Sequence, residues 1–569
     1  MLKKWVMKSI DVDKAEVLAS SLALSPVMAK ILVGRGIDSL ESANNFFYPS
    51  LSAMLDPFLL KGVKSAVERI ITAIKCGESV CIYGDYDVDG ITGTALLVSY
   101  LRKSGLDCKY FIPNRFNDGY GLNRESLQKI IDSGNTVIIS VDCGTTSIQE
   151  AEFCKKKGVD LIIVDHHTPG EKLPDAAVVI NPLQDGCSYP FKMLAGVGVA
   201  FNLLIALRSE MREKGLFKNK SEPDLREYFD LLALGTIADV VPLIGQNRLY
   251  VHYGLQKLES NSRHGVAALK KVAGIKGQLS CGQVGFRIAP RLNAAGRMES
   301  AVPGVELLLS ADVEECSILA GELDSSNAER QATERSILDD AISMVKQSGS
   351  YPECRSIVLS SSNWHQGVIG IVASRLVDLY HRPTILIATD EAGNAKGSGR
   401  SIPGFHLLDA LTGCSHLLER FGGHRYAAGV ALKAGNIESF SKTFETVAAG
   451  LLGDSELTPT LDVDADISPV EVDIELVNEL RRLEPFGSMN PEPTLVMRAV
   501  TVLESRKVGE GHLKLRITAG GAVFDAIAFR QADSSTDGLL DIAFFPELNV
   551  WNNTVSLQLR VKAIRKAVE

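Results

Sequence analysis

Residues 81–97 read CIYGDYDVDGITGTALL and place three carboxylates, Asp85, Asp87 and Asp89, between an apolar run and a segment typical of a helix. Unit charges about 4 Å apart repel by roughly 4 kcal/mol at an effective dielectric constant near 20, so the cluster is costly unless a cation shares it. A divalent metal ion is the usual counter-charge. The alternative is a solvated turn, because Asp and Gly are ordinary turn residues. The rest of the chain has to decide between the two.

The same stretch belongs to an alternating pattern that extends to about residue 245. Apolar runs (SVCIYG, CKYFIP, TVIISVD and VDLIIVD) are separated by helical segments such as GTALLVSYLRKSG and SIQEAEFCKKKG. Buried parallel strands joined by crossover helices give this pattern. We therefore predict an α/β domain built on a mostly parallel sheet.

The pattern changes twice further along the chain. Residues 311–347 are charged, contain a single glycine and place apolar residues at helical spacing, which predicts a long connecting helix. A strand, helix, strand pattern then predicts a second, smaller α/β domain, and alternating strands beyond residue 455 predict an antiparallel barrel of the OB-fold type. The predicted segments are a helical N-terminus (1–55), the parallel-sheet domain (56–310), the connecting helix (311–347), the smaller α/β domain (348–452) and the barrel (455–569).

Length, cysteine usage and charge exclude several classes of protein. The 569 residues exceed one hydrophobic core and suggest roughly three or four domains. No apolar run approaches the roughly 20 residues of a membrane span, and the N-terminus is too polar for a signal peptide, so we expect a cytoplasmic protein. Ten scattered cysteines without a C-x-x-C pair argue against structural zinc and a disulfide framework. A net charge of −9 argues against nonspecific coating of nucleic acid but allows a local basic groove.

Further metal-competent residues follow the predicted strands. Asp142 ends TVIISVD, Asp165, His166 and His167 end VDLIIVDHH, and Asp239 lies in LALGTIADVVPL. Taken singly, the two strand-end aspartates could cap helices and the first histidine could be a polar neighbour. The carboxyl ends of parallel strands, however, line one crevice, so together these residues favour a metal site. Carboxylates with an imidazole suit Mn²⁺ or Mg²⁺, and two ions bridged by one aspartate would activate water for phosphoester hydrolysis.

GDYDVDG, VDCG, DHH and ADVVPL, in this order, resemble the four motifs of the DHH phosphoesterase superfamily. The resemblance continues through YGLN, INPLQ, LAGVGVAF, APRLNAAGRM, NWHQGVIGIVASR, GSGRSIPGF and GGHRYAAG, and over essentially the whole chain it is to the branch of exonucleases specific for single-stranded DNA. It implies an enzyme that degrades single-stranded DNA from the 5′ end to mononucleotides in DNA repair and recombination. It also implies that the smaller α/β domain is the DHH-associated domain, which holds the substrate.

The resemblance assigns roles to the acidic residues. It implies two Mn²⁺ or Mg²⁺ ions with the ligands Asp87, Asp89, Asp142, His166 and Asp239, of which Asp142 bridges the ions. Asp85 would support the first ion, and His167 would contact the scissile phosphate or orient water. The chain departs from the pyrophosphatase branch of the superfamily at Tyr83, where that branch has a metal-binding histidine. We therefore expect weaker binding of the first ion.

A glycine-rich segment is the candidate pocket for a terminal phosphate. GSGRS offers the hydroxyls of Ser398 and Ser401 and the guanidinium of Arg400, whose fork suits a phosphate. Arg115 and Arg297 are further cations in polar segments, although each arginine could equally form a surface ion pair. The resemblance places a 5′-phosphate pocket and a strand-binding groove among such residues.

Two histidines are candidates for the same groove. His424 lies in a Gly-Gly-His turn that allows close approach of a nucleotide, and His365 precedes a helix whose N-terminus could add amide donors. In the barrel, Phe524, Phe529, Phe544, Phe545 and Trp551 lie among basic residues, but most are expected to be core.

Two other functions remain open from the sequence. One is a DHH phosphodiesterase for short oligonucleotides or cyclic dinucleotides, and the other is a non-catalytic scaffold that binds single strands. The expected partner is single-stranded DNA, with a single-strand-binding protein and a DNA helicase as candidate suppliers of substrate, no membrane and a monomeric chain.

Overall fold

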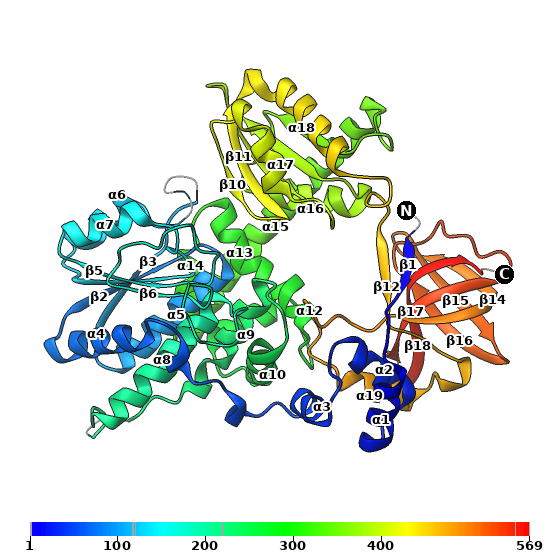
Figure 1. The fold of residues 1–569 in the computed structure, drawn as a ribbon, viewed down its shortest axis with the longest axis horizontal. Coiled ribbons are helices and arrows are strands. Elements are labelled where there is room, and N and C mark those ends of the chain that lie inside the picture. Colours follow the sequence, from blue (N-terminus) through cyan, green and yellow to red (C-terminus); the bar gives the residue numbers. More distant parts are fainter. Residues whose placement is uncertain (1–2, 116–118, 120, 219–220, 552–553, 568–569) are drawn as a thin grey trace. The chain divides into compact units, whose positions relative to one another are not determined.

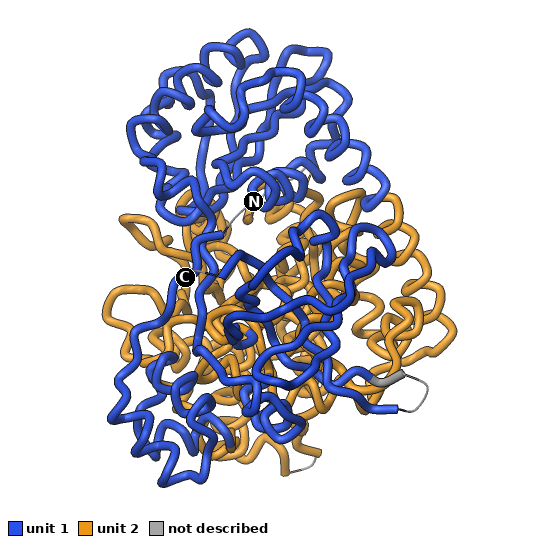
Figure 2. The backbone as a smooth tube through the Cα atoms, turned by 90° about the vertical axis from the view of Figure 1, so that its right-hand side faces the viewer, with its two compact units in different colours: residues 1–47, 330–484, 492–569 blue, residues 48–329, 485–491 orange. Residues whose placement is uncertain are grey.

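The computed structural model describes residues 3–115, 119, 121–218, 221–551 and 554–567. The chain forms two compact units (Figure 2). We call residues 48–329 and 485–491 the sheet unit, and residues 1–47, 330–484 and 492–569 the barrel unit.

The sheet unit contains the predicted parallel sheet. Its five strands are all parallel and run in the order β3 (Asp107–Phe111), β2 (Ser79–Gly84), β4 (Val137–Val141), β5 (Asp160–Val164) and β6 (Val178–Ile180). Four of them coincide with the apolar runs of the sequence. The fifth, β6, has only three residues, too few for a recognisable pattern.

Helices cover both faces of this sheet, as parallel strands require (Figure 1). One face packs against α4 (Val63–Cys76), α5 (Val88–Lys103) and α8 (Gly196–Glu213), and α9 (Phe229–Ala238) packs in turn on α5 and α8. The other face packs against α6 (Arg124–Asp132) and α7 (Ile148–Lys156). Glycine ends α4 in the left-handed conformation at Gly77, with a φ of 67°.

The sheet unit also contains helices outside these two layers. They include α10 (Gly245–Glu259), α11 (His264–Val272), α12 (Cys281–Gln283), the π-helical turn η4 (Val284–Ile288), α13 (Ala289–Met298) and α14 (Val302–Leu309), and the short 3-10 helices η1 (Leu51–Ala53), η2 (Pro57–Leu59) and η3 (Leu225–Tyr228). The predicted long helix is confirmed as α15 (Val313–Ser348), and the boundary between the two units falls within it.

The smaller α/β domain has a five-stranded mixed sheet. The strand order is β10 (Arg420–Gly423), β11 (Ala427–Lys433), β9 (Asn394–Arg400), β8 (Thr384–Thr389) and β7 (Ile357–Ser361), and only the pair of β7 and β8 is parallel. Its helices are α16 (Ile369–Tyr380), α17 (Leu407–Gly413) and α18 (Ile437–Leu451).

The C-terminal strands close into a barrel of the predicted OB-fold type. Its strands follow the order β14 (Leu495–Val508), β15 (His512–Ala519), β16 (Ala522–Ala528), β18 (Thr554–Lys566) and β17 (Leu540–Trp551), and β17 pairs back onto β14. The short strand β13 (Ala465–Asp466) adds to β14 in parallel. The prediction of a purely antiparallel barrel is wrong at one pair, because β16 and β18 run parallel. Phe524, Phe544 and Phe545 are buried in its core, whereas Phe529 is 47% exposed. The side chain of Trp551 lies outside the described residues.

The N-terminal segment is not purely helical. Helices α1 (Val12–Leu22), α2 (Pro26–Gly34) and α3 (Leu40–Phe47) are preceded by β1 (Lys4–Met7), which pairs in parallel with β12 (Thr460–Val463). The partner strand lies more than 450 residues away in the chain, so a local pattern could not reveal the pairing. None of the helices formed by the described residues combines the length and the apolar character that crossing a membrane demands.

Candidate metal centre

The carboxyl-terminal edge of the parallel sheet carries most of the candidate metal ligands. Asp85 follows β2, Asp142 follows β4, and His166 and His167 follow β5. Asp239 arrives from a helix instead, as the residue that ends α9. The sheet therefore brings together residues that are up to 154 positions apart, from Asp85 to Asp239.

Two glycines allow the loops to meet at this edge. A Cβ atom on Gly90 would lie 2.6 Å from the backbone nitrogen of Asp85, and one on Gly196 would lie 2.8 Å from the Cβ of Asp142. Asp142 itself has a φ of 63°, a conformation that aspartate tolerates better than most residues. Close backbone approach is thus part of how the centre is built.

Two carboxylates of the opening stretch are fixed by backbone amides. Asp87 caps α5 and accepts hydrogen bonds from the backbone N–H groups of Asp89 (3.0 Å) and Gly90 (3.1 Å). Asp89 accepts from the N–H groups of Gly196 (2.6 Å) and Val197 (2.9 Å), which begin α8. The charge cluster therefore also ties α5 to α8, and the positive end of a helix dipole lies at each carboxylate.

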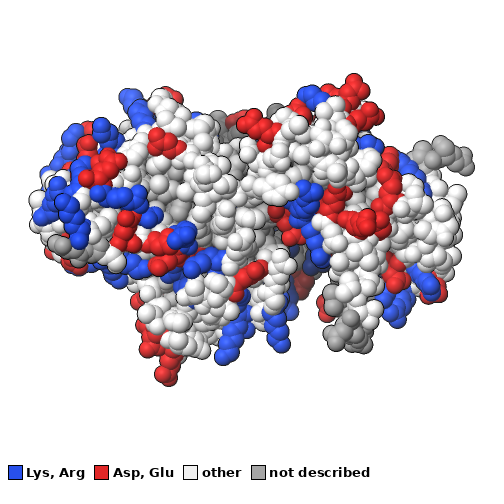
Figure 3. Space-filling view, turned by 90° about the horizontal axis from the view of Figure 1, so that it is seen from below, with Lys and Arg blue, Asp and Glu red and all other residues white. Residues whose placement is uncertain are grey.

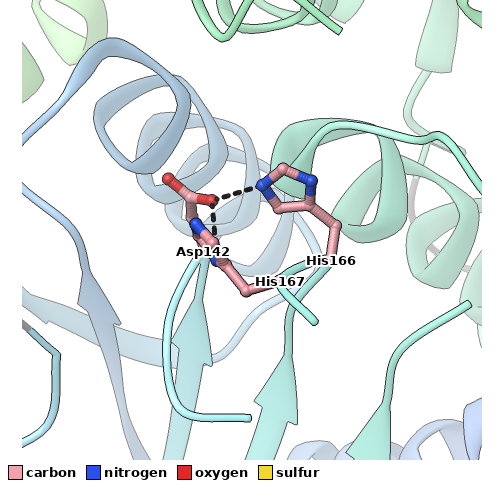
Figure 4. A group of neighbouring side chains, drawn as sticks. All are labelled: Asp142, His166 and His167. Atoms are coloured by element: carbon pink, nitrogen blue, oxygen red, sulfur yellow. Dashed lines mark ion pairs between the residues drawn. The ribbon is translucent and has the colours of Figure 1, made fainter. Parts of the chain in front are cut away.

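His166 lies at the middle of the cluster. Its Nε2 is 3.2 Å from Oδ1 of Asp142, 3.5 Å from Oδ2 of Asp239 and 3.8 Å from Oδ2 of Asp89 (Figure 4 shows the first pair). Three groups have ligand atoms within 4.8 Å of one another: Asp85, Asp87 and Asp142; Asp89, His166 and Asp239; and Asp142, His166 and His167. Asp142 thus belongs to two groups, as a bridging ligand would.

The electrostatics of these residues fit a bound cation. Burial, and then the charge of Asp87, raises the pKa of Asp89 to about 7. Burial and neighbouring carboxylates likewise raise the pKa values of Asp85, Asp142 and Asp239. Burial, followed by the charge of His167, lowers the pKa of His166 to about 4, which keeps its imidazole neutral, the form that binds metal.

The second histidine is held differently. Oδ1 of Asp165 lies 2.8 Å from Nδ1 of His167 and accepts hydrogen bonds from the backbone N–H groups of His166 and His167, while Oδ2 accepts from Thr145. Burial alone would lower the pKa of His167, but the hydrogen bond and charge of Asp165 outweigh it and raise the pKa to about 9. Asp165 therefore orients His167 rather than capping a helix.

Sequence reasoning missed one member of this network. The Nδ2 of Asn181 donates to Oγ1 of Thr145 (2.9 Å) and to the carbonyl of His167 (2.8 Å). Asn181 is fully buried. The only sequence signal is its place in the INPLQ motif, which by itself indicates no chemistry.

Two predicted phosphate-binding arginines lie beside the first carboxylate group. The guanidinium of Arg115 lies 5.3 Å from the centre of the Tyr86 ring, next to Asp85. Burial raises the pKa of Tyr86, and the charges of Arg115 and Arg297 oppose that rise. α13, which carries Arg297, packs closely here, because a Cβ on Gly296 would lie 2.6 Å from the Tyr86 carbonyl oxygen.

The remaining predicted phosphate-binding residues belong to the barrel unit. Nη1 of Arg400 donates to Oγ of Ser398 (3.2 Å) and to the Gly399 carbonyl (2.8 Å). Both side chains face the start of α16, since a Cβ on Gly370 would lie 2.7 Å from Oγ of Ser398. These residues gather at a helix N-terminus, a favourable place for an anion.

The other residues of this set lie in neighbouring loops. His365 is half-buried, precedes α16, and its Nδ1 accepts from the Gly367 N–H (3.2 Å). Ser401 follows β9 and donates through Oγ to the Phe405 carbonyl (2.9 Å). His424 is exposed in the turn between β10 and β11.

The barrel has a polar cavity of about 650 Å³ on its strands. It is lined by Arg506, Lys514, Asp525, Asn549, Thr554, Ser556 and Gln558. Two cations and several hydrogen-bonding groups suit a nucleic-acid backbone. On the face seen in Figure 3, Lys and Arg are interspersed with Asp and Glu rather than gathered in one basic tract.

Comparison with known proteins identifies three family models. The DHH family N-terminal domain matches residues 79–236, the DHHA1 domain matches residues 354–450, and the RecJ OB domain matches residues 463–563. The single-stranded-DNA-specific exonuclease RecJ of Bacillus subtilis is 40% identical over 568 residues, 98% of this chain and 70% of that protein.

Solved structures of RecJ are similar to this chain over its whole length. RecJ of Thermus thermophilus in complex with Mn²⁺ is 32% identical and superimposes with a TM-score of 0.86 over 100% of this chain and 80% of that one. The same protein in complex with Mg²⁺ gives a TM-score of 0.80 at 30% identity, over 100% and 79% of the two chains.

Proposed function

This chain belongs to the RecJ family of single-stranded-DNA-specific exonucleases, and from that membership we propose that it removes nucleotides from the 5′ end of single-stranded DNA and releases 5′-mononucleotides. It is an exonuclease that depends on Mn²⁺ or Mg²⁺. DNA repair and recombination are the processes in which such an activity is used.

The buried cluster around Asp142 is the observation that carries this proposal. Asp85, Asp87 and Asp142 would hold one ion, and Asp142 would share the second with Asp89, His166 and Asp239. When bound, these ions supply Lewis acidity at a phosphoryl group and lower the pKa of water. The raised pKa values of the carboxylates support the assignment. Ionised carboxylates are costly at this place in the fold, and a bound cation would offset that cost.

The protein's own groups would position the scissile phosphate. Asp165 fixes the ring of His167, and we assign to that ring the contact with the scissile phosphate. Arg115 and Arg297, beside Tyr86 and Asp85, would bind phosphates of the strand close to the first ion. Charge-assisted contacts of this kind orient the reacting group without taking part in bond breaking.

The 5′ end would be recognised in the smaller α/β domain. Ser398, Arg400 and Ser401 offer a guanidinium and two hydroxyls close to the N-terminus of α16, and His365 and His424 lie in adjoining loops. A terminal phosphate carries more charge than an internal one and has more oxygens to accept hydrogen bonds, so such a pocket distinguishes an end. The barrel cavity lined by Arg506 and Lys514 would bind the strand farther from its end.

The proposal extends to the protein's surroundings. Single strands arise where a helicase separates a duplex, so we propose a helicase and a single-strand-binding protein as suppliers of substrate to a monomeric, cytoplasmic enzyme. We also retain residues 56–310, 348–452 and 455–569 as the proposed limits of the three folded domains. Light scattering at working concentration tests the monomer directly.

A degradation assay on labelled DNA tests the function. The substrate is a 3′-labelled single-stranded oligomer, with and without a 5′-phosphate, in Mn²⁺ or EDTA, and Asp142→Ala is the inactive control. We expect metal-dependent shortening from the 5′ end that is faster with the phosphate. An intact oligomer with cleavage of dinucleotides only would indicate a small-substrate phosphodiesterase, and binding without cleavage would indicate a scaffold.

A further inference from the structure

A short segment from the C-terminal part of the chain packs in the sheet unit. Residues 485–491, with the sequence PFGSMNP, belong to that unit, although both flanking stretches belong to the barrel unit. Gly487 and Asn490 exchange two backbone hydrogen bonds, of 2.9 and 3.1 Å, around Ser488 and Met489. Met489 has a φ of 56°. The segment is therefore a tight two-residue turn, which we call the 485–491 turn.

The tip of this turn contacts the loop that follows Asp239. The carbonyl of Ser488 accepts a hydrogen bond from the backbone N–H of Leu243, at 2.8 Å. Leu243 is only 3% exposed. A Cβ on Gly487 would lie 2.5 Å from Cδ1 and 2.9 Å from Cγ of Leu243, so the turn can approach only because position 487 is glycine.

Buried polar groups hold the base of the turn. The Nδ2 of Asn490 donates to the Pro485 carbonyl at 2.8 Å, and Nη1 of Arg248 in α10 donates to the same oxygen at 3.4 Å. Asn490 is 1% exposed and Arg248 is 4% exposed. Because buried polar groups are costly when they are left without partners, these contacts fix where the turn sits.

The contacted loop contains a strained residue next to a proposed metal ligand. Val240 has a φ of 60°, although it is β-branched and 70% exposed. Such a conformation persists only when the surrounding structure imposes it. The loop is held before Val240 by the Asp239 N–H, which donates to Gly235, and after it by the bond from Leu243 to Ser488. Asn247 adds a hydrogen bond from Nδ2 to the Pro242 carbonyl at 3.0 Å.

We propose that the 485–491 turn positions the metal centre: by holding Leu243 it keeps Val240 in its strained conformation and the carboxylate of Asp239 beside His166. This inference rests on the proposed role of Asp239 as a metal ligand. Groups that orient a ligand from outside the coordination sphere affect affinity, because the ligand must otherwise be reordered when the ion binds.

The test uses the full chain with Gly487→Val, which places new side-chain atoms against Leu243. Hydrogen exchange in EDTA reports the Leu243 amide directly, and calorimetry with Mn²⁺ reports the affinity of each ion. We expect exchange at Leu243 at least about tenfold faster and the ion at Asp239 bound about tenfold more weakly, the low end of the loss typical for a group that orients a ligand. The matched control is Gly321→Val in α15, where a Cβ meets nothing within 4 Å.

A second variant keeps the inference testable if Gly487→Val fails to fold. Asn490→Ser shortens the side chain that holds the Pro485 carbonyl and adds no bulk, so it should shift both readouts in the same direction by a smaller factor. Faster exchange at Leu243 with unchanged Mn²⁺ affinity in both variants would overturn the inference. Asp239→Asn distinguishes a failure of this inference from a failure of the proposed ligand role. If Asp239→Asn also leaves the Mn²⁺ affinity unchanged, the assignment of Asp239 as a ligand is itself wrong.

Discussion

Oδ1 of Asp142 and Nε2 of His166 lie 3.2 Å apart, and within the described part of the chain both atoms are buried without a hydrogen-bond partner. Buried polar atoms are almost always paired, and an unpaired carboxylate oxygen is among the most costly. A divalent cation held by Asp142 and His166 would give both atoms a partner. The pair is therefore the point at which the proposed metal centre can be tested most directly.

Asp142→Asn should abolish turnover and metal binding together. Asparagine tolerates the φ of 63° at this position, so the backbone should be retained while the negative charge proposed to bridge the two ions is lost. We expect activity to fall by more than about 100-fold. That exceeds the loss caused by removing a group that only orients a metal ligand, which is at most about 100-fold. Thermal unfolding with and without Mn²⁺ should show a rise in Tm for the wild type only.

The matched control for this variant is Asp175→Asn, which removes a surface ion pair with Lys155 in the same unit. It should retain both activity and the Mn²⁺-induced rise in Tm. A full Mn²⁺ response in Asp142→Asn would contradict the bridging role.

Ionisation of the Asp89 carboxyl should lower the stability of the metal-free protein as the pH rises. Burial raises its folded-state pKa to about 7, well above the value of about 3.9 in an unfolded chain. The native state therefore holds the proton more tightly, and the stability that this provides is fully present below about pH 4 and is lost as the pH passes through 7. In EDTA, the stability of Asp89→Asn relative to the wild type should therefore be lowest near pH 4 and should rise steadily from there to pH 8.

Urea unfolding of the two proteins at several pH values measures this difference. The comparison is needed because His166, whose pKa is lowered, contributes stability in the opposite direction, and this contribution cancels between wild type and variant. A difference that stays constant from pH 5 to pH 8 would show that the carboxyl is already ionised in the folded protein.

The fold was accessible from the sequence wherever local pattern and tertiary environment agree. Four sheet strands and α15 follow from apolar runs and helical spacing, because strands buried on both faces and a long uninterrupted helix leave clear patterns. The pairing of β1 with β12 and the docking of the 485–491 turn were not accessible. Both depend on contacts between segments more than 200 residues apart.

The candidate site was predicted in composition but not in arrangement. Strand ends predicted that Asp142 and His166 would meet, and the structure brings them together. The grouping of Asp89 with His166 and Asp239, apart from Asp87, depends on the hydrogen bonds from Gly196 and Val197 that turn its carboxylate towards α8. No spacing rule contains that information.

Asp165→Asn should lower the pKa of His167 and slow catalysis. The hydrogen bond and charge of Asp165 outweigh burial and hold that pKa at about 9, so neutralising Asp165 should let it fall below the ordinary value near 6.5. We expect kcat to fall by about 10- to 100-fold with little change in KM. An NMR titration of the His167 ring in EDTA, together with steady-state kinetics, measures both effects.

Asp160→Asn is a suitable control, since Asp160 begins the same strand but pairs with Arg69 at the surface. Asp160→Asn should leave the pKa of His167 unchanged. An unchanged His167 pKa in Asp165→Asn would mean that Asp165 does not set the charge of this ring.

The two ions should bind with different affinities. The group of Asp85, Asp87 and Asp142 contains no nitrogen ligand, and the hydroxyl of Tyr83 donates to the Gly121 carbonyl at 3.0 Å instead of facing it. Calorimetry without nucleic acid should therefore resolve one tight and one weaker Mn²⁺ site. Equal, tight occupancy of both sites would count against this expectation, and Tyr83→Phe should leave the weaker site unchanged.

Arg400→Ala should remove the preference for a 5′-phosphate. Its guanidinium, held against Ser398 and the Gly399 carbonyl at the start of α16, is the strongest anion-binding group of the proposed pocket. Loss of a charged hydrogen bond of about 1.5–3 kcal/mol corresponds to a KM roughly 10- to 100-fold higher for phosphorylated ends. Ends without the phosphate should be cleaved as before, since they never made the contact.

Arg355→Ala, which removes a surface ion pair with Asp454, is the matched control. If Arg400→Ala slows both substrates equally, the arginine supports the fold or the strand and does not read the end.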